Sequence, residues 1–407
     1  MTAPTWPYRR IIKRYEGTGT LEGPGGQGAC SFEILQLTTG RLLARCELER
    51  DRLIYDWVGK SAELRGETKT GEKVAAHAGF VRSARPVPKD GGLITELKLR
   101  CSTATIGQPE GTTALRYGLT NLKLEGNEPC REHFADGRFE LGRQSHVRVE
   151  GYDVIIRSLR GSEELLDEIE ETRGIGVMAE ATVTASLDDR ERVDGLMDKL
   201  CLLLSLSVGR GIVWVYRESI DADGHVTEAR HISAIAKRWN GLELVPTEAI
   251  EGLVAATYPT FLTAYERWGL RNAIHSYVDA LLEGDYLEFR ALKMAVVIEY
   301  LNRRYCAGRG KMSFREALSG MCSSLGVSLS EEELDLVKNA RNKLVHEATF
   351  LKEEAAPSVQ EQYFFLAMLV GRLLLAIVGY QGDWYDWSRA SDGNGPRRMT
   401  LGLDPVA

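Results

Sequence analysis

Residues 330–348 read SEEELDLVKNARNKLVHEA, and this stretch decides how the C-terminal part of the chain folds. Ser330 and Glu333 form a capping-box pattern, in which each side chain accepts a hydrogen bond from the backbone N–H of the other residue. Beyond it, one stripe at about 100° per residue holds the apolar positions Leu334, Val337, Leu344, Val345 and Ala348. The stretch therefore predicts an amphipathic helix that packs through one face.

Arg341 falls within this apolar stripe, whereas Asn342 and His346 lie together on the adjacent polar flank. A guanidinium that is desolvated without a partner is strongly unfavourable, so Arg341 must pair with an acid or face a cavity. The expected partner is Glu299, which stands in the apolar run KMAVVIEYL at residues 293–301. Two opposite charges in the apolar stripes of neighbouring helices indicate either a functional site or a structural ion pair.

Helical spacing of apolar residues continues on both sides of this stretch. After Pro246 the sequence predicts no strand, and it predicts helices at residues 247–268, 270–283, 286–306, 313–325, 330–349 and 358–380. The most apolar segment, Tyr363–Tyr380, is long enough to span a membrane. Arg372 stands at its middle, however, and an arginine at bilayer depth costs at least about 2.5 kcal/mol. We therefore expect a buried helix of a soluble bundle.

Residues 1–160 show the alternation that is typical of strands. In the run LITELKLRC at residues 93–101, the odd-numbered positions form one face and the even-numbered positions the other. Asp90-Gly91 directly before it predicts a hairpin with the preceding run AAHAGFVRS. Similar strand patterns occur at residues 32–37, 42–48 and 147–156. This part of the chain is expected to form an antiparallel β domain.

Between residues 161 and 245 the pattern is mixed. Helices are expected at SEELLDEIEE (residues 162–171) and at residues 188–206, and extended segments at residues 182–185, 211–216 and 225–232. The predicted fold class is thus α+β and multidomain. We expect a β-rich domain at 1–160, a mixed α/β segment at 161–245 packed on it or continuous with it, an all-helical bundle at 246–388 and a loosely held tail at 389–407.

The composition is that of an ordinary globular protein, with 407 residues, 43% of them hydrophobic and 27% charged. The 51 basic residues are outnumbered by 58 acidic ones, which argues against non-specific coating of duplex nucleic acid but permits a local basic patch. The N-terminal run MTAPTWPYRRIIKRYEG lacks the apolar stretch of a secretory signal. The seven cysteines never form a C-x-x-C pair, so we expect neither a disulfide framework nor a zinc knuckle, and a cytoplasmic location fits best.

Two glycine clusters fail as phosphate-binding loops. GPGGQG at residues 23–28 precedes a strand instead of opening a helix, so a hairpin turn is expected there. GRGKM at residues 308–312 has Met312 where a Walker loop needs Ser or Thr, and it is expected to be a loop between helices. The sequence shows no metal-ligand spacing either, and we expect no cofactor and no metal.

Three elements of the C-terminal region, taken together, resemble one known superfamily. They are an I-E-x-L element at residues 298–301, the R-N-x-x-x-H motif at residues 341–346 and the run GYQGDWYDWS at residues 379–388. Their order and setting within residues 247–388 resemble the HEPN superfamily. The tail and the large N-terminal region are most similar to those of the ApeA-type anti-phage defence proteins.

This resemblance implies a metal-independent endoribonuclease that works as a homodimer, with the motif helices of two subunits facing each other across a cleft. It implies that Arg341 and His346 are catalytic, that Asn342 supports them and that Glu299 orients Arg341. The residue types suit the reaction, because histidine can exchange protons near neutral pH and arginine matches the geometry of phosphate oxygens. The nucleophile would be the 2′-hydroxyl of the RNA, and the products a 2′,3′-cyclic phosphate and a 5′-hydroxyl.

Two further expectations concern partners. A cationic rim that could contact RNA, or that could equally be a solvated loop, consists of Arg303, Arg304, Arg309, Lys311 and Arg315. The N-terminal region is expected to sense or regulate, for example by binding a phage-derived trigger, but this follows from architecture and not from any motif. No membrane partner is expected.

Two alternatives remain open from the residues. One is a non-catalytic HEPN module that binds nucleotides or a partner protein, with a purely structural pair between Arg341 and Glu299. The other is a fold-stabilising ion pair in a scaffold protein. His275, in the run RNAIH, stands one position closer to its arginine than His346 does, and it is expected to be an ordinary histidine on a helix face.

Overall fold

The computed structural model describes residues 11–24, 26–48, 55–89, 92–124, 128–133, 139–159, 166, 169, 174–233, 242–282, 285–351, 357–388 and 396–401. The chain divides into two compact units. The first comprises Met1–Leu122, Tyr152–Gly195 and Val213–Ala236, and the second Lys123–Gly151, Leu196–Ile212 and Lys237–Ala407. These divisions differ from the boundaries expected at residues 160 and 245, because segments far apart in the sequence pack together in each unit.

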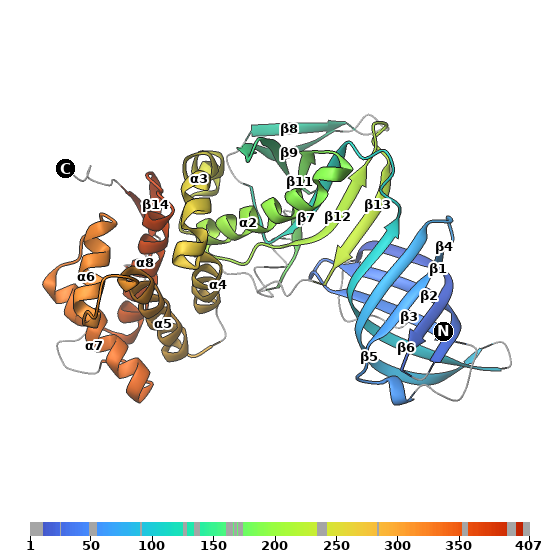
Figure 1. Cartoon of the computed structure of the whole chain (residues 1–407), viewed down its shortest axis with the longest axis horizontal. Helices are drawn as coiled ribbons and strands as arrows, with labels where there is room; N and C mark the ends of the chain where they lie inside the picture. The colour runs from blue at the N-terminus through green and yellow to red at the C-terminus, as the bar shows by residue number, and fades with distance from the viewer. Residues whose placement is uncertain are drawn as a thin grey trace. The chain divides into compact units, whose positions relative to one another are not determined.

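Six antiparallel strands of the first unit close into a barrel (Figure 1). They are β1 (Ile11–Gly23), β2 (Gly26–Leu37), β3 (Leu42–Leu48), β4 (Ala62–Thr68), β5 (Lys73–Lys89) and β6 (Gly92–Gly107). Their order is β3-β2-β1-β4-β5-β6, and β6 pairs back onto β3, which removes both sheet edges. Alternate residues fill the barrel interior, among them Leu21, Ile34, Leu42, Cys46 and Leu97, all fully buried.

The last strand of the barrel also begins an open sheet. Residues 95–101 of β6 pair with β3, whereas residues 103–107 pair with β13 (Val226–Ile232). From β13 the sheet of this unit continues through β12 (Trp214–Ile220), β7 (Ala114–Thr120), β11 (Val177–Thr184) and β10 (Tyr152–Ser158). One long strand therefore pairs with β3 to close the barrel and with β13 to continue the sheet beyond it.

The second unit is mainly helical (Figure 1). After the 3₁₀ turn Leu187–Asp189, α2 (Arg190–Val208) contributes its residues from Leu196 onward to this unit. A further 3₁₀ turn, Thr247–Ala249, precedes the helices α3 (Ile250–Trp268), α4 (Leu270–Leu281), α5 (Leu287–Cys306), α6 (Phe314–Ser324), α7 (Glu331–Glu347) and α8 (Val359–Ile377). Helix α5 packs against α4, α6, α7 and α8, so it is the central helix of the bundle. The hairpin of β8 (Glu128–His133) and β9 (Phe139–Val149) contacts α3.

Local signals explain where several helices begin. Capping boxes are present at Ser313 for α6, Ser330 for α7 and Ser358 for α8. In α7, the Ser330 hydroxyl accepts a hydrogen bond from the Glu333 N–H at 3.1 Å, and the Glu333 carboxylate accepts one from the Ser330 N–H at 2.8 Å. The predicted helices after residue 247 are confirmed to within a few residues at each end.

Most other predicted segments are also confirmed. The strands at residues 93–101, 32–37 and 42–48 lie within β6, β2 and β3, and the hairpin between β5 and β6 brings Lys89 opposite Gly92. Asp90 and Gly91 lie outside the described residues. Gly23 pairs with Gly26 at the turn between β1 and β2, as expected for the first glycine cluster. Of the helix expected at residues 162–171, the described residues are Leu166 and Ile169, which are helical and buried.

Three predictions about elements are wrong. Residues 147–156 are not one strand but the end of β9 and most of β10, joined at Glu150 and Gly151, whose positive φ angles of 49° and 88° make a tight turn. Strands do occur after Pro246, because β14 (Asp383–Asp386) pairs with β15 (Arg397–Thr400). Residues 397–400 are therefore held by pairing, whereas a loose tail was expected from residue 389 onward.

The apolar segment Tyr363–Tyr380 is a buried helix, as predicted, over the part that belongs to α8. Among the described residues α8 is the one helix long and apolar enough to cross a membrane, and 72% of its most apolar window is buried inside the structure. Arg372 lies over the Trp384 ring, 5.9 Å from its centroid. The core helix of a globular bundle has this pattern of burial.

Candidate functional site

Helices α5 and α7 bring Glu299 and Arg341 together in the second unit. The Arg341 Nη2 atom donates a hydrogen bond to Glu299 Oε2 at 2.8 Å. The predicted pairing of these two residues is therefore present. Both side chains are half-buried, with 21% of Arg341 and 28% of Glu299 exposed, so solvent reaches one side of the pair.

Arg341 is held at more than one point. Its Nη1 atom donates to the Asn342 side-chain oxygen at 2.9 Å, and its guanidinium carbon lies 5.4 Å from the centroid of the Phe314 ring. The Nε atom is buried and has no hydrogen-bond partner within the described part of the chain. One hydrogen on each terminal nitrogen remains available, which is the arrangement that binds two oxygens of a phosphate.

Glu299 is shared between two arginines. While Oε2 accepts from Arg341, Oε1 accepts from Arg303 one helical turn later, at 3.1 Å. The hydrogen bond from Arg341 is the main reason why the pKa of the Glu299 carboxyl lies below its ordinary value, and Arg303 adds to the effect. Glu299 is therefore an anion at neutral pH, and it can hold the arginine but not act as an acid there.

His346 lies in the last turn of α7 with an exposed side chain. It makes no hydrogen bond or ion pair with any residue that the structure describes. Five positions along a helix correspond to a rise of about 7.5 Å and a rotation of about 140°, so Arg341 and His346 of one chain leave the helix in different directions. A single chain thus brings Glu299, Arg341 and Asn342 together but leaves His346 apart from them.

The stripe predicted for α7 is wrong at its end. Leu334, Val337 and Leu344 are buried as expected, but Val345 is 40% exposed, and Ala348 is exposed as well. Ala348 ends the helix in the left-handed conformation, with φ at 52°, so the helical wheel no longer applies there. A second exposed valine, Val296 at 53%, lies one turn before Glu299 on α5. Two exposed apolar side chains therefore flank the polar site.

The basic residues of the predicted rim have different environments. Arg303 is bound to Glu299, and Arg315 on α6 pairs with Glu331 and Asp335 on α7. Arg304 and Arg309 lie over the rings of the tyrosines four residues before them, with guanidinium-to-centroid distances of 5.3 and 4.1 Å. Lys311, in the expected loop between α5 and α6, is exposed. Only Arg303 of this group contacts the Glu299–Arg341 pair in the described structure.

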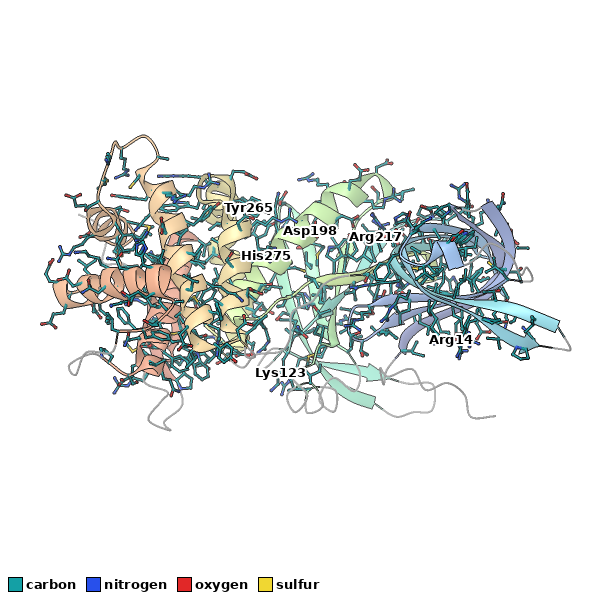
Figure 2. All side chains as sticks on the ribbon, turned by 90° about the horizontal axis from the view of Figure 1, so that it is seen from below. Arg14, Lys123, Asp198, Arg217, Tyr265 and His275 are labelled. Atoms are coloured by element: carbon teal, nitrogen blue, oxygen red, sulfur yellow. The ribbon has the colours of Figure 1, made fainter. Side chains whose placement is uncertain are left out.

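His275, the comparison histidine, is exposed on α4, and its side chain is labelled in Figure 2. This agrees with its interpretation as an ordinary histidine on a helix face.

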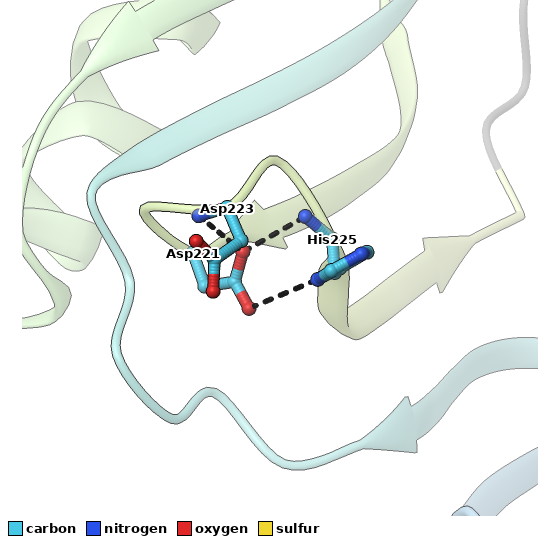
Figure 3. A group of neighbouring side chains, drawn as sticks. All are labelled: Asp221, Asp223 and His225. Carbon is cyan, nitrogen blue, oxygen red and sulfur yellow. Dashed lines mark hydrogen bonds and ion pairs between the residues drawn. The ribbon is translucent and has the colours of Figure 1, made fainter.

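The described residues contain one group that could hold a metal ion, in the turn between β12 and β13 (Figure 3). Asp221, Asp223 and His225 each offer a ligand atom, and these atoms lie within 4.8 Å of one another. However, the Asp221 carboxylate already accepts hydrogen bonds from the backbone N–H groups of Asp223 and His225, at 3.0 and 2.8 Å. The group is mostly exposed, and these bonds explain it as a turn motif.

A buried polar cluster in the sheet of the first unit was not predicted. Glu218 on β12 accepts from Lys13 Nζ at 2.5 Å and from Arg116 Nε at 2.8 Å. Next to it, Tyr15 and the fully buried His231 are joined by a hydrogen bond of 3.0 Å through His231 Nε2. Burial lowers the pKa of His231 to about 4, so its ring is neutral at neutral pH.

A second buried charge lies on the same strand β12 (Figure 2). Arg217, only 1% exposed, pairs with Asp194 at 2.7 Å and with Glu228 at 2.8 Å. The run WVYRESI at residues 214–220 gives no sign of this burial, because Arg217 stands between Tyr216 and the charged Glu218. Glu218 and Arg217 thus each pair with two side chains of opposite charge, which is typical of structural networks.

No family model, curated protein or solved structure matches this chain. The chemistry of the candidate site must therefore be argued from its own residues. The bundle offers a fixed, half-exposed guanidinium with free N–H groups, an anion that orients it and, on the same helix, a histidine that is free to act on an external group.

Proposed function

We propose that this chain is a metal-independent endoribonuclease of the HEPN type, acting as a homodimer in the cytoplasm in prokaryotic anti-phage defence. The observation that carries the proposal is the geometry of Arg341, whose guanidinium is fixed by Glu299, Asn342 and the Phe314 ring while part of its N–H edge stays open. A fixed cation of this kind stabilises the charge that develops on a phosphate during strand cleavage.

RNA supplies the nucleophile itself through the 2′-hydroxyl. The protein needs a base to remove its proton, an acid to protonate the leaving 5′-oxygen and a cation for the phosphate. Histidine can take either proton-transfer role near neutral pH. Each chain contributes one histidine, His346, to this site. A dimer would therefore supply two histidines, one as the base and one as the acid.

The exposed valines Val296 and Val345 support the assembly. They flank the site on α5 and α7, and exposed apolar groups around a polar centre are typical of protein interfaces. In the proposed dimer the two α7 helices face each other, so that His346 of one subunit approaches Arg341 of the other. The N-terminal region would keep this nuclease activity low until phage infection.

The direct test is cleavage of single-stranded RNA by the purified protein in the presence of EDTA. We expect products with 2′,3′-cyclic phosphate and 5′-hydroxyl ends. His346→Ala should lower the rate by at least about a hundredfold, because it removes the proton-transfer group. His275→Ala is the matched control, since it removes another exposed histidine of the same bundle, and its rate should equal that of the wild type. Equal rates for all three proteins would contradict the proposal.

A second candidate function is a non-catalytic HEPN module that binds a nucleotide or a partner protein. The isolation of His346 within one chain favours it. In that case wild-type protein leaves RNA intact at every concentration, and Arg341→Ala changes only stability, because Glu299 loses one of its two arginine partners. The two candidates therefore differ in whether Arg341→Ala changes an RNA cleavage rate or only an unfolding midpoint.

A further inference from the structure

Phe314 is the first residue of α6 and lies against Arg341 of α7. The contact is a cation–π interaction between the Arg341 guanidinium and the Phe314 ring. The guanidinium is half-buried, and its Nε atom has lost water without gaining a partner. The Phe314 ring therefore packs against a guanidinium whose hydrogen bonds leave one nitrogen, Nε, without a partner among the described residues.

The position of Phe314 is itself fixed from two sides. The capping box places it, because the Ser313 hydroxyl accepts from the Glu316 N–H at 3.3 Å and the Glu316 carboxylate accepts from the Ser313 N–H at 2.8 Å. Asn302 of α5, only 4% exposed, donates from Nδ2 to the Phe314 carbonyl at 3.5 Å. The start of α6 is thus attached to α5.

These contacts form a closed ring through three helices. Glu299 of α5 binds Arg341 of α7, Arg341 lies over Phe314 of α6, and Phe314 is held by Asn302, three residues after Glu299 on α5. A long arginine side chain has many rotamers, and a single ion pair leaves most of them accessible. Together, these contacts of Glu299, Phe314 and Asn302 favour one rotamer of Arg341 before any substrate binds.

We propose that Phe314 is a positioning residue, which sets the orientation of the Arg341 guanidinium so that its free N–H groups meet the scissile phosphate of RNA. This inference rests on the proposed nuclease function. The effect should be specific to the chemical step, since a preorganised cation acts where charge develops and not on the binding of the whole RNA strand.

The test compares Phe314→Leu with Phe314→Tyr in the full chain, using a single-stranded RNA substrate. Phe314→Leu keeps an apolar side chain at the helix start but removes the ring, and we expect kcat to fall about tenfold with KM nearly unchanged. Phe314→Tyr keeps the ring and should retain most of the wild-type kcat. Phe364→Leu is the matched control, because it removes another half-exposed ring of the bundle, on α8, and should leave kcat unchanged.

A second readout does not depend on cleavage. In nuclear magnetic resonance spectra, the Arg341 Nε–H signal should be shifted by the ring current and slow to exchange in the wild type. Both properties should be lost in Phe314→Leu and kept in Phe314→Tyr.

The outcomes separate the two claims. If the wild type cleaves RNA and Phe314→Leu cleaves it equally fast, the positioning role is overturned while the nuclease proposal stands. If Phe314→Leu and Phe364→Leu lose activity in proportion to lost stability, the role is structural and the inference is also overturned. A wild-type protein that leaves RNA intact removes both claims.

Discussion

Arg341 and His231 show how the surroundings of a charged or titratable group decide its role. Arg341 is half-exposed, bound by an acid and covered by a ring, so its charge is kept and directed outward. His231 is fully buried beside Tyr15, and this burial, to which the charge of Lys13 adds, outweighs the opposite effect of Glu218 and keeps the pKa of the ring low. The surroundings of Arg341 suit the role proposed for it. The surroundings of His231 make the stability of the first unit depend on pH.

His231 should make the first unit sensitive to mild acid. Its pKa is about 4 in the folded protein against 6.5 as the ordinary value, so the unfolded chain takes up a proton first as the pH falls. The stabilisation is present above pH 6.5 and is lost between about pH 6.5 and 4. We expect the free energy of unfolding in urea to fall by about 2 kcal/mol from pH 7 to pH 5 because of this residue.

His231→Gln is the control, since glutamine keeps a polar partner for Tyr15 but does not titrate. The variant should be less stable at pH 7, and its stability should change less between pH 7 and pH 5. An identical change in both proteins would show that another group is responsible.

Helix α7 shows why its start could be predicted and its end could not. The start depends on Ser330 and Glu333, three residues apart, and the pattern is visible in the sequence. The end depends on Ala348, which adopts a left-handed conformation that alanine rarely takes and that glycine normally supplies. No local signal marks it, and the apolar stripe was therefore extended too far, to Val345 and Ala348.

Ala348→Gly should stabilise the bundle, although a glycine within a helix usually lowers its stability. The change removes the strain of a positive φ angle at a helix end, and we expect a gain of about 0.5–1 kcal/mol in the free energy of unfolding. Ala307→Gly at the end of α5 is the matched control. Ala307 has a φ of −56°, so there the glycine should only cost stability. Equal losses in the two variants would argue against strain at Ala348.

Long-range pairing limits what the sequence predicts about the sheets. Alternation located β2, β3 and β6, but it gave no sign that β6 pairs with both β3 and β13. Closure of the barrel depends on partners about fifty residues apart, and period-two alternation carries no information about which strands meet. The short strands β14 and β15 escaped prediction because four residues are too few to show a period.

At the level of the whole chain, the division into units could not be predicted either. The hairpin of β8 and β9 belongs with the helices, as does most of α2, whereas residues 213–236 return to the first unit. Of the candidate site, the pairing of Arg341 with Glu299 followed from two charges in apolar stripes. Phe314 did not, because nothing in the sequence indicates which aromatic ring covers a given arginine.

The catalytic proposal requires more than one chain, since His346 makes no hydrogen bond or ion pair with any described residue of its own subunit. The most direct measurement is an experimental structure of the assembled protein, which gives the distance between the two His346 imidazoles and their direction. The catalytic proposal predicts a symmetric dimer in which both imidazoles line one groove, with Arg341 of each subunit facing it and Val296 and Val345 buried at its rim. A monomer, or a dimer in which the His346 side chains face solvent on opposite sides, would contradict it.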